Sequence, residues 1–283
     1  MCTEISLGVQ MYAVAKLLHM SIFINGTLTN METWPKCSEA RLNKLENIEQ
    51  NFMRKILKAH SKTPIEALYL ELGIIPLRYN LMTRRILYLH EIMNRDDDEL
   101  TKKVVLAQKD SSYKGDFYPQ ALENMVALGI SDNQLSESKE KLRTDLTKKV
   151  NAAAYKFLIG KAESHSKVRH ECYKNCEGAE HYFDPRFTTD VTNMLFKFRT
   201  VTYLVKNNFR NNFKNTNILC PLCESHNDNQ EHIFECRKIL EVHNQEILVK
   251  HDDIFSSDID NLLKVSTTLM KLVKIRDSLL SKE

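Results

Sequence analysis

The residues best suited to metal chemistry lie in one short segment of the sequence. It reads Cys220-Pro-Leu-Cys-Glu-Ser-His-Asn-Asp-Asn-Gln-Glu-His-Ile-Phe-Glu-Cys236 and holds three of the chain's seven cysteines and two of its ten histidines. Two thiolates separated by two residues can grip one tetrahedral ion from a tight turn, which Pro221 helps to form. The spacing Cys220-x2-Cys223-x8-His232-x3-Cys236 therefore predicts a four-ligand metal site.

The donor types predict which metal would bind. Three thiolates and one imidazole select zinc over hard cations, and a full protein shell leaves no position for a catalytic water, so we expect a structural Zn²⁺. If residues 230–242 are helical, His232 and Cys236 project from one face and close the tetrahedron. His226 is the alternative imidazole ligand, although Cys-x2-Cys-x2-His would bend the loop tightly.

Two other clusters contain residues that could bind a metal ion, but each is better explained without one. The group His170-x-Cys172-x3-Cys176-x4-His181 matches no common zinc module and lies in a charge-rich segment. Residues 96–98, three consecutive aspartates, follow the end of a predicted helix and suit a solvated turn better than a magnesium site. Phosphate-binding glycine loops, nucleophile elbows and His-Glu-x-x-His pairs are absent from the sequence.

A basic and aromatic segment precedes the cysteine cluster, with no acidic residue between Val191 and Cys223. Basic side chains neutralise phosphates while exposed aromatic rings stack on unpaired bases, which is typical of single-stranded nucleic-acid binding. Phe196 and Phe198 are better explained as core residues. The predicted nucleic-acid contacts are Lys197, Arg199, Lys206, Phe209, Arg210, Phe213 and Lys214.

The elements that must position these residues are helices. Only seven glycines and six prolines interrupt 283 residues, and apolar residues recur at helical spacing, so the sequence predicts an all-α fold. Cap and stop signals place helix starts after Ser38, at Thr63-Pro64-Ile65-Glu66 and at Pro76, with stops near Gly73 and Gly129. Further helices are expected within 94–120 and over 7–24, 119–128, 137–164, 188–208 and 258–280, the last amphipathic.

The net charge and the overall composition exclude few functions by themselves. A formal net charge of +3 does not announce a nucleic-acid binder, so that hypothesis depends on the local distribution of charge. The apolar run from Val9 to Ile24 is broken by Lys16 and His19 and fits neither a signal peptide nor a membrane span. Seven irregularly spaced cysteines favour a reducing intracellular compartment, cytoplasmic or nuclear.

Several blocks in this order resemble a known family. They are the segments Asn25–Trp34, Leu45–Leu57 and His60–Gly73, the run Arg84-Arg85-Ile-Leu-Tyr-Leu-His90, and downstream Ala107–Lys109, Lys114–Asp116, His165–Val168, Phe196–Thr200 and the Cys-Cys-His-Cys cluster. Together they are similar to the region that follows the polymerase palm in non-LTR retrotransposon reverse transcriptases. The similarity extends over nearly the whole chain, although the family's spacing from the histidine to the last cysteine is often one residue longer.

The resemblance implies a helical thumb, a helical linker region and a C-terminal zinc knuckle that helps to hold template RNA or target DNA. The catalytic aspartates of the family's polymerase and its separate endonuclease domain have no counterpart in this sequence, and two-metal phosphoryl transfer needs such ligands. The expected parts are a palm-to-thumb junction at 1–36, a thumb-like bundle at 37–95, the linker at 96–187, the basic helix with the zinc knuckle at 188–245 and the terminal helix at 246–283.

Two functions from different classes follow. The first is a non-catalytic, nucleic-acid-binding C-terminal fragment of a reverse transcriptase, which would contact single-stranded RNA or DNA and work with a polymerase domain supplied in trans. The alternative is a protein-interaction adaptor in which zinc staples a helical surface, such as the apolar face of residues 258–280, without nucleic-acid affinity. Neither requires an enzymatic activity of this chain or a membrane.

Overall fold

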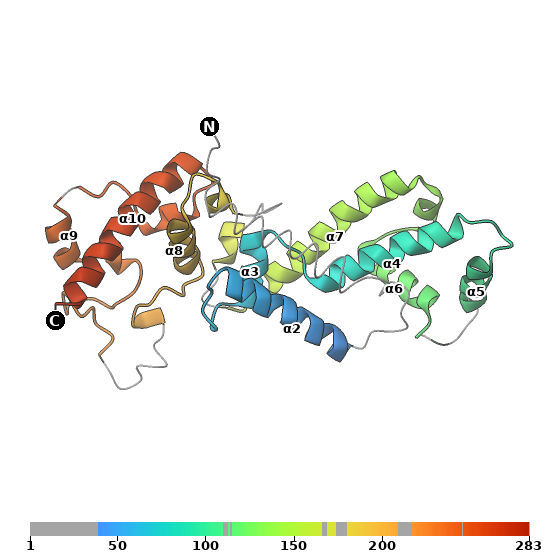
Figure 1. The fold of residues 1–283 in the computed structure, drawn as a ribbon, viewed down its shortest axis with the longest axis horizontal. Helices are drawn as coiled ribbons and strands as arrows, with labels where there is room; N and C mark the ends of the chain where they lie inside the picture. The colour runs from blue at the N-terminus through green and yellow to red at the C-terminus, as the bar shows by residue number, and fades with distance from the viewer. Residues whose placement is uncertain are drawn as a thin grey trace. The chain divides into compact units, whose positions relative to one another are not determined.

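The structure is a computed structural model that describes residues 39–109, 113, 115–165, 169–173, 180–208, 217–244 and 246–282. Over these residues the protein is all-α: the chain forms helices from α2 to α10, and the single β-bridge, between Leu219 and Asn227, belongs to no strand (Figure 1). None of the described helices combines the length and the apolarity needed to cross a bilayer. The predicted helix at 7–24, the junction segment 1–36 and the Ser38 cap lie outside the described residues.

The chain divides into two compact units, and each draws on separate parts of the sequence. Among the described residues, unit 1 comprises 53–72 and 162–282, and unit 2 comprises 39–52 and 73–161. This grouping differs from the five consecutive parts expected from the sequence. The reason is α3 (Ile65–Leu72), whose buried Glu71 bonds to Arg199, so this helix packs with the C-terminal half of the chain.

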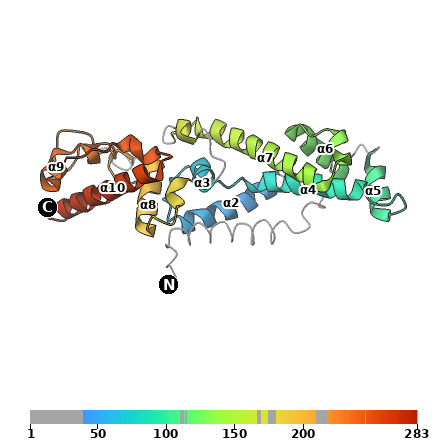
Figure 2. The ribbon, with the colours of Figure 1, turned by 90° about the horizontal axis from the view of Figure 1, so that it is seen from above.

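Unit 2 is a set of packed helices with one main core. The core is formed by buried side chains such as Ile86, Leu89, Met125 and Leu146, and an ion pair between Arg78 and Glu46 at 2.6 Å joins α4 to α2. Figure 2 shows α7 running alongside α4, with α6 next to them. The helices are α2 (Glu39–Ile56), whose residues from Met53 on belong to unit 1, α4 (Leu77–Met93), α5 (Leu100–Lys109), α6 (Phe117–Leu128) and α7 (Lys139–Ala162), which ends at the boundary with unit 1.

The boundaries in this part of the chain confirm most of the local signals. Gly73 and Gly129 both adopt positive φ, at 57° and 61°, where a residue without Cβ ends a helix without strain. The three aspartates at 96–98 lie in the turn before α5, where Asp97 pairs with Lys102 at 2.6 Å. The interpretation of this run as a solvated turn is therefore confirmed.

Unit 1 holds the cysteine cluster and is built around the last helix. Asp258 caps that helix by accepting hydrogen bonds from the backbone N–H groups of Asp260 and Asn261, as the start signal predicted. The predicted helix at 188–208 is too long: α8 ends at Arg199, and Val201 has a φ of 52°. The helices are α3 (Ile65–Leu72), α8 (Thr189–Arg199), α9 (Arg237–His243) and α10 (Ile259–Leu280).

The apolar face of α10 is covered within unit 1. This helix packs on α8, on α9 and on the 3₁₀ turns His232–Phe234 and His251–Phe255, and Figure 1 shows α10 between α9 and α8. The adaptor hypothesis used this face as an exposed interaction surface, and that placement is wrong because the chain itself buries it. The buried residues are Leu262, Val265, Ser266, Leu269, Leu272, Val273 and Arg276.

Candidate metal centre

The first two ligands lie in a tight loop closed by backbone hydrogen bonds. The loop begins and ends at the bridge between Leu219 and Asn227. Within it the N–H of Cys220 donates to the carbonyl of His226 at 2.7 Å, and the N–H of Glu224 donates to the carbonyl of Cys220 at 2.9 Å. Glu224 takes a φ of 53°, which lets the chain reverse directly after Cys223. Both sulfur atoms thus reach the same side of the turn.

The other two ligands do not come from one helix, in contrast to the sequence prediction. His232 begins a 3₁₀ turn that ends at Phe234, and Cys236 is the N-cap of α9. Cys236 has an extended backbone, with φ −64° and ψ 113°, and this conformation interrupts the expected helix over 230–242. A hydrogen bond from the N–H of His232 to Asn229 Oδ1 at 2.7 Å fixes the start of the turn.

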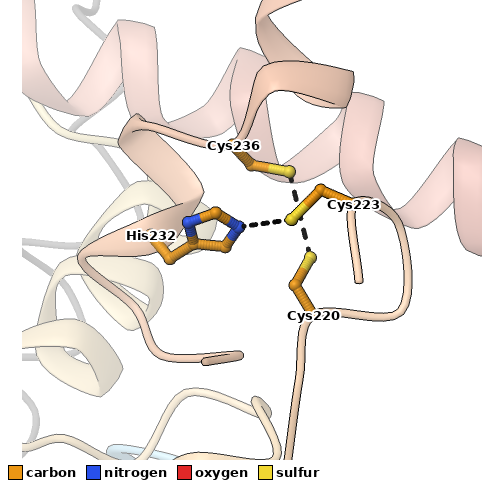
Figure 3. A group of neighbouring side chains, drawn as sticks. All are labelled: Cys220, Cys223, His232 and Cys236. Carbon is orange, nitrogen blue, oxygen red and sulfur yellow. Dashed lines mark hydrogen bonds between the residues drawn. The ribbon is translucent and has the colours of Figure 1, made fainter. Parts of the chain in front are cut away.

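The four ligand atoms converge. All of them lie within 4.8 Å of one another, with Cys220 Sγ 3.9 Å from Cys236 Sγ and Cys223 Sγ 3.2 Å from His232 Nε2. In a tetrahedron with metal–sulfur bonds of about 2.3 Å and metal–nitrogen bonds of about 2.0 Å, such edges measure roughly 3.5–3.8 Å. Figure 3 shows the four side chains pointing toward a common centre. The cluster has the donors and the dimensions of a four-coordinate metal site.

The histidine in this set is His232. It is buried, at 7 % exposure, and its Nε2 faces the sulfur atoms. His226 is exposed; its ring stacks on that of His232 with centroids 5.2 Å apart, and its Nδ1 lies 3.0 Å from the Ser225 hydroxyl. The geometry therefore favours His232 over the alternative ligand His226.

The pKa values of Cys223 and Cys236 are shifted in opposite directions. Burial acts to raise the pKa of Cys223, but hydrogen bonds from the Ser225 hydroxyl, from nearby backbone N–H groups and from His232 outweigh it and lower that pKa to about 5. Burial, reinforced by the neighbouring thiols, raises the pKa of Cys236 to about 12. A bound cation stabilises both thiolates, and Cys236 must give up a proton when the ion binds.

Buried polar groups attach the metal loop to the rest of unit 1. Arg276 Nη2 of α10 donates to both carboxylate oxygens of Asp228, at 3.0 and 3.1 Å, and the backbone N–H of Lys206 donates to Asp228 Oδ2 at 2.8 Å. The side chains of Arg276 and Asp228 are 7 % and 3 % exposed. Sequence reasoning missed this pair, although an arginine on the apolar face of a predicted helix was a usable signal.

A second set of buried contacts is centred on Gln230, in the segment between Cys223 and His232. It connects this segment to the end of α8 and to His251, which precedes α10. Gln230 Nε2 donates to the Phe198 carbonyl at 2.6 Å and lies 3.1 Å from His251 Nε2, while Gln230 Oε1 accepts from Asn208 Nδ2 at 3.1 Å. The Gln230 side chain is buried, so its amide makes these contacts instead of contacts with water. The sequence carried no signal for this group.

The predicted nucleic-acid contacts fall into three groups: two are half-exposed, Arg199 is buried, and four lie outside the described residues. Lys197 is half-exposed at the end of α8, and Lys206 is half-exposed with its Nζ 3.1 Å from the Leu219 carbonyl, which places its ammonium against the metal loop. Phe196 and Phe198 are buried, which confirms their interpretation as core residues. The remaining predicted contacts lie outside the described residues: Phe209, Arg210, Phe213 and Lys214.

The prediction that Arg199 contacts phosphate is wrong. Its side chain is 1 % exposed and pairs with Glu71 at 3.0 Å and with Glu180 at 2.6 Å. It also lies over the rings of Tyr173, Tyr182 and Phe255. Because two carboxylates already neutralise the guanidinium inside unit 1, it is not available to a polynucleotide.

The spacing of the second cysteine and histidine group matches no common zinc module. Cys172 is partly buried and His181 is exposed, while the side chains of His170 and Cys176 are not among those described. Within the described part of the chain, the four-ligand cluster is the group of cysteine, histidine and acidic side chains close enough to hold a metal ion. Comparisons of the chain with protein-family models, with curated proteins and with solved structures found no match.

Proposed function

We propose that this chain is a non-catalytic nucleic-acid-binding protein whose C-terminal module folds around one structural Zn²⁺. The observation that carries the proposal is the convergence of Cys220, Cys223, His232 and Cys236 within 4.8 Å. Soft sulfur and nitrogen donors favour zinc, and four protein ligands saturate a tetrahedral ion. Such a site stabilises a fold and leaves no open position for an activated water.

The nucleic-acid part of the proposal depends on the chemistry next to the metal loop. Lys206 holds its ammonium against the loop through the Leu219 carbonyl, and Lys197 is half-exposed on α8. The sequence after Lys206 adds further cations and aromatic residues, which suit phosphates and unpaired bases respectively. The resemblance to the C-terminal region of non-LTR retrotransposon reverse transcriptases supports the same class of ligand, single-stranded RNA or DNA.

In this proposal the chain contributes binding and positioning, and a polymerase domain acting in trans would supply the chemistry. An intracellular location, where thiols stay reduced, suits four cysteine and histidine ligands held without disulfides. The apolar face of α10, the example of an interaction surface given for the adaptor alternative, is buried within unit 1. Binding of a polynucleotide is thus the function that we favour.

The first experiment measures metal and RNA binding on the same preparation. Full-length protein should contain one zinc per chain by elemental analysis and bind a labelled unstructured RNA in a fluorescence anisotropy titration. Affinity should fall between about 50 and 200 mM salt, with a log–log slope of about 0.7 for each phosphate contact. Cys223→Ser should lose the metal, whereas Cys172→Ser, a partly buried cysteine outside the cluster, should keep it. Binding that is absent or insensitive to salt contradicts the proposal.

A further inference from the structure

The solvent-facing side of α10 carries a row of lysines. Lys264, Lys271 and Lys274 are exposed, and Lys282 is exposed just beyond the last turn of the helix. Seven residues are close to two helical turns and three residues are slightly less than one, so the first three lysines lie along one stripe about 15 Å long. We call Lys264, Lys271 and Lys274 the α10 lysine stripe. Two exposed hydroxyl residues, Thr267 and Ser278, lie along it.

The cations of this stripe have no carboxylate partner among the described residues, where none of the three forms an ion pair. Neither acidic residue of α10 forms an ion pair with these lysines: Asp260 lies 3.5 Å from Arg186, and Asp277 makes no ion pair among the described residues. By contrast, the exposed cations of the neighbouring helix α9, Arg237 and Lys238, both pair with Glu241. The stripe therefore presents three exposed ammonium groups that no ion pair holds among the described residues.

The opposite side of α10 fixes the stripe relative to the metal loop. Arg276, on the buried side, bonds to Asp228 between the second and third metal ligands. The same helix packs on α9 and on the 3₁₀ turn that carries His232. A ligand that touches the stripe would consequently be held in a defined position beside the metal loop.

The chemistry of the stripe fits a chain of phosphates better than a lipid surface. A membrane-bound amphipathic helix inserts its apolar face into the bilayer, whereas the apolar face of α10 is buried in protein. None of the exposed large apolar residues in the described part of the chain belongs to α10. Lysine ammonium groups on flexible stems contact phosphates as point charges without reading the bases.

We infer that the α10 lysine stripe binds the phosphate backbone of the polynucleotide that the metal-centred module holds. This inference rests on the proposed function and extends it to a surface outside the predicted segment 197–214. It assigns to Lys264, Lys271 and Lys274 the phosphate contacts that Arg199, buried with Glu71, does not make.

The test compares two triple variants with equal charge loss. The first is Lys264→Gln, Lys271→Gln and Lys274→Gln; the control is Lys103→Gln, Lys109→Gln and Lys148→Gln, which removes three exposed lysines of unit 2. Loss of three single-strand phosphate contacts lowers the log–log salt slope by about 2 and weakens RNA binding on the order of 100-fold at 0.1 M salt. The RNA affinity of the control should stay within about twofold of wild type, because losing charges far from the bound RNA has a small, screened effect. Circular dichroism and zinc content should be unchanged in both variants.

The outcomes separate this inference from the proposed function. If wild type binds RNA and the two variants weaken binding equally, the stripe is not the contact and the inference is wrong, while the proposed function stands. If wild type binds neither RNA nor single-stranded DNA, both fail. An arm with vesicles of phosphatidylserine and phosphatidylcholine covers the other anionic ligand: binding to vesicles that only the α10 variant loses, with RNA binding intact, overturns the inference.

Discussion

Arg199 Nε lies 3.1 and 3.0 Å from the two carboxylate oxygens of Glu71, although 128 residues separate the pair in sequence. Tyr173 and Tyr182 donate their hydroxyl groups to the same carboxylate, and Arg199 Nη1 donates to the Ile254 carbonyl at 3.0 Å. Burial raises the pKa of Glu71, and the charge of Arg199 opposes that rise. The pair thus joins α3 and α8 in the interior of unit 1.

Replacing Arg199 by methionine should destabilise unit 1 strongly. The substitution keeps most of the volume but leaves the Glu71 charge buried without its partner, which costs about 3–5 kcal/mol. Urea unfolding followed by circular dichroism measures the change. Lys197→Gln, on the same helix and half-exposed, is the matched control and should stay within about 0.5 kcal/mol of wild type.

A second variant tests the cause of that loss. In the double variant Glu71→Gln with Arg199→Met the unpaired charge of Glu71 is gone while Glu180 still lacks its partner, so stability should recover in part relative to Arg199→Met alone. If the double variant is less stable than the single one by the full cost of a second substitution, the two residues act independently and the buried pair is not what joins these helices.

Local signals in the sequence were sufficient for the class of fold and for several helix ends. Asp258 caps α10 and Gly129 ends α6 because each effect depends on residues within one turn of the chain. The metal ligands were predictable for the same reason, since all four lie within 17 consecutive residues. Even so, the helix expected over 230–242 is divided at Cys236.

Long-range partners were beyond the reach of the sequence. Arg199 sits in a basic and aromatic segment, which suggested phosphate contact, and nothing near it in the chain points to Glu71 as its partner. Asp228 and Arg276 are 48 residues apart and form a buried pair in the same way. In both cases a charged residue at a core-facing helical position was the available signal, and its partner could not be named from periodicity alone.

Substituting His232 and His226 one at a time should show which of the two binds the metal. His232→Ala removes the Nε2 that lies 3.2 Å from Cys223 Sγ, so one ligand is lost and zinc content should drop below stoichiometry. His226→Ala removes an exposed ring that stacks on His232 and contacts the Ser225 hydroxyl, and it should leave zinc content unchanged. Elemental analysis after dialysis measures both. Loss of metal from His226→Ala with retention in His232→Ala would reverse the ligand assignment.

Two glycines of unit 2 should respond in opposite directions to alanine. Gly129 has a φ of 61°, so Gly129→Ala forces a Cβ into the left-handed region and should destabilise unit 2 by about 1 kcal/mol. Gly160 lies within α7, where an added Cβ meets nothing within 4 Å, so Gly160→Ala should stabilise by about 0.5–1 kcal/mol. Thermal unfolding reports both changes. Equal effects of the same sign would contradict the backbone argument.

The contacts of His251 predict how the stability of unit 1 depends on pH. Gln230 Nε2 donates to the Phe198 carbonyl and, with its second hydrogen, to His251 Nε2, while His251 Nδ1 faces Asp252 Oδ1 at 3.4 Å. His251 must therefore be neutral with its proton on Nδ1, because a proton on Nε2 would oppose the Gln230 N–H. Burial lowers the pKa of His251, although the charge of Glu231 acts to raise it.

The sign of the effect follows from this lowered pKa. In the unfolded chain a histidine takes up its proton near pH 6.5, while folded His251 stays neutral, so unfolding becomes more favourable as the pH falls through that value. Stability should decrease below about pH 6.5 by up to about 1.4 kcal/mol for each pH unit until the folded-state pKa is reached. Urea midpoints at a series of pH values measure this decrease. His251→Gln should flatten it, whereas His181→Gln, which removes an exposed histidine of the same unit, should keep the wild-type profile. Protonation of the metal ligands contributes equally to both variants. If stability depends on pH in the same way in both, His251 is not the titrating group.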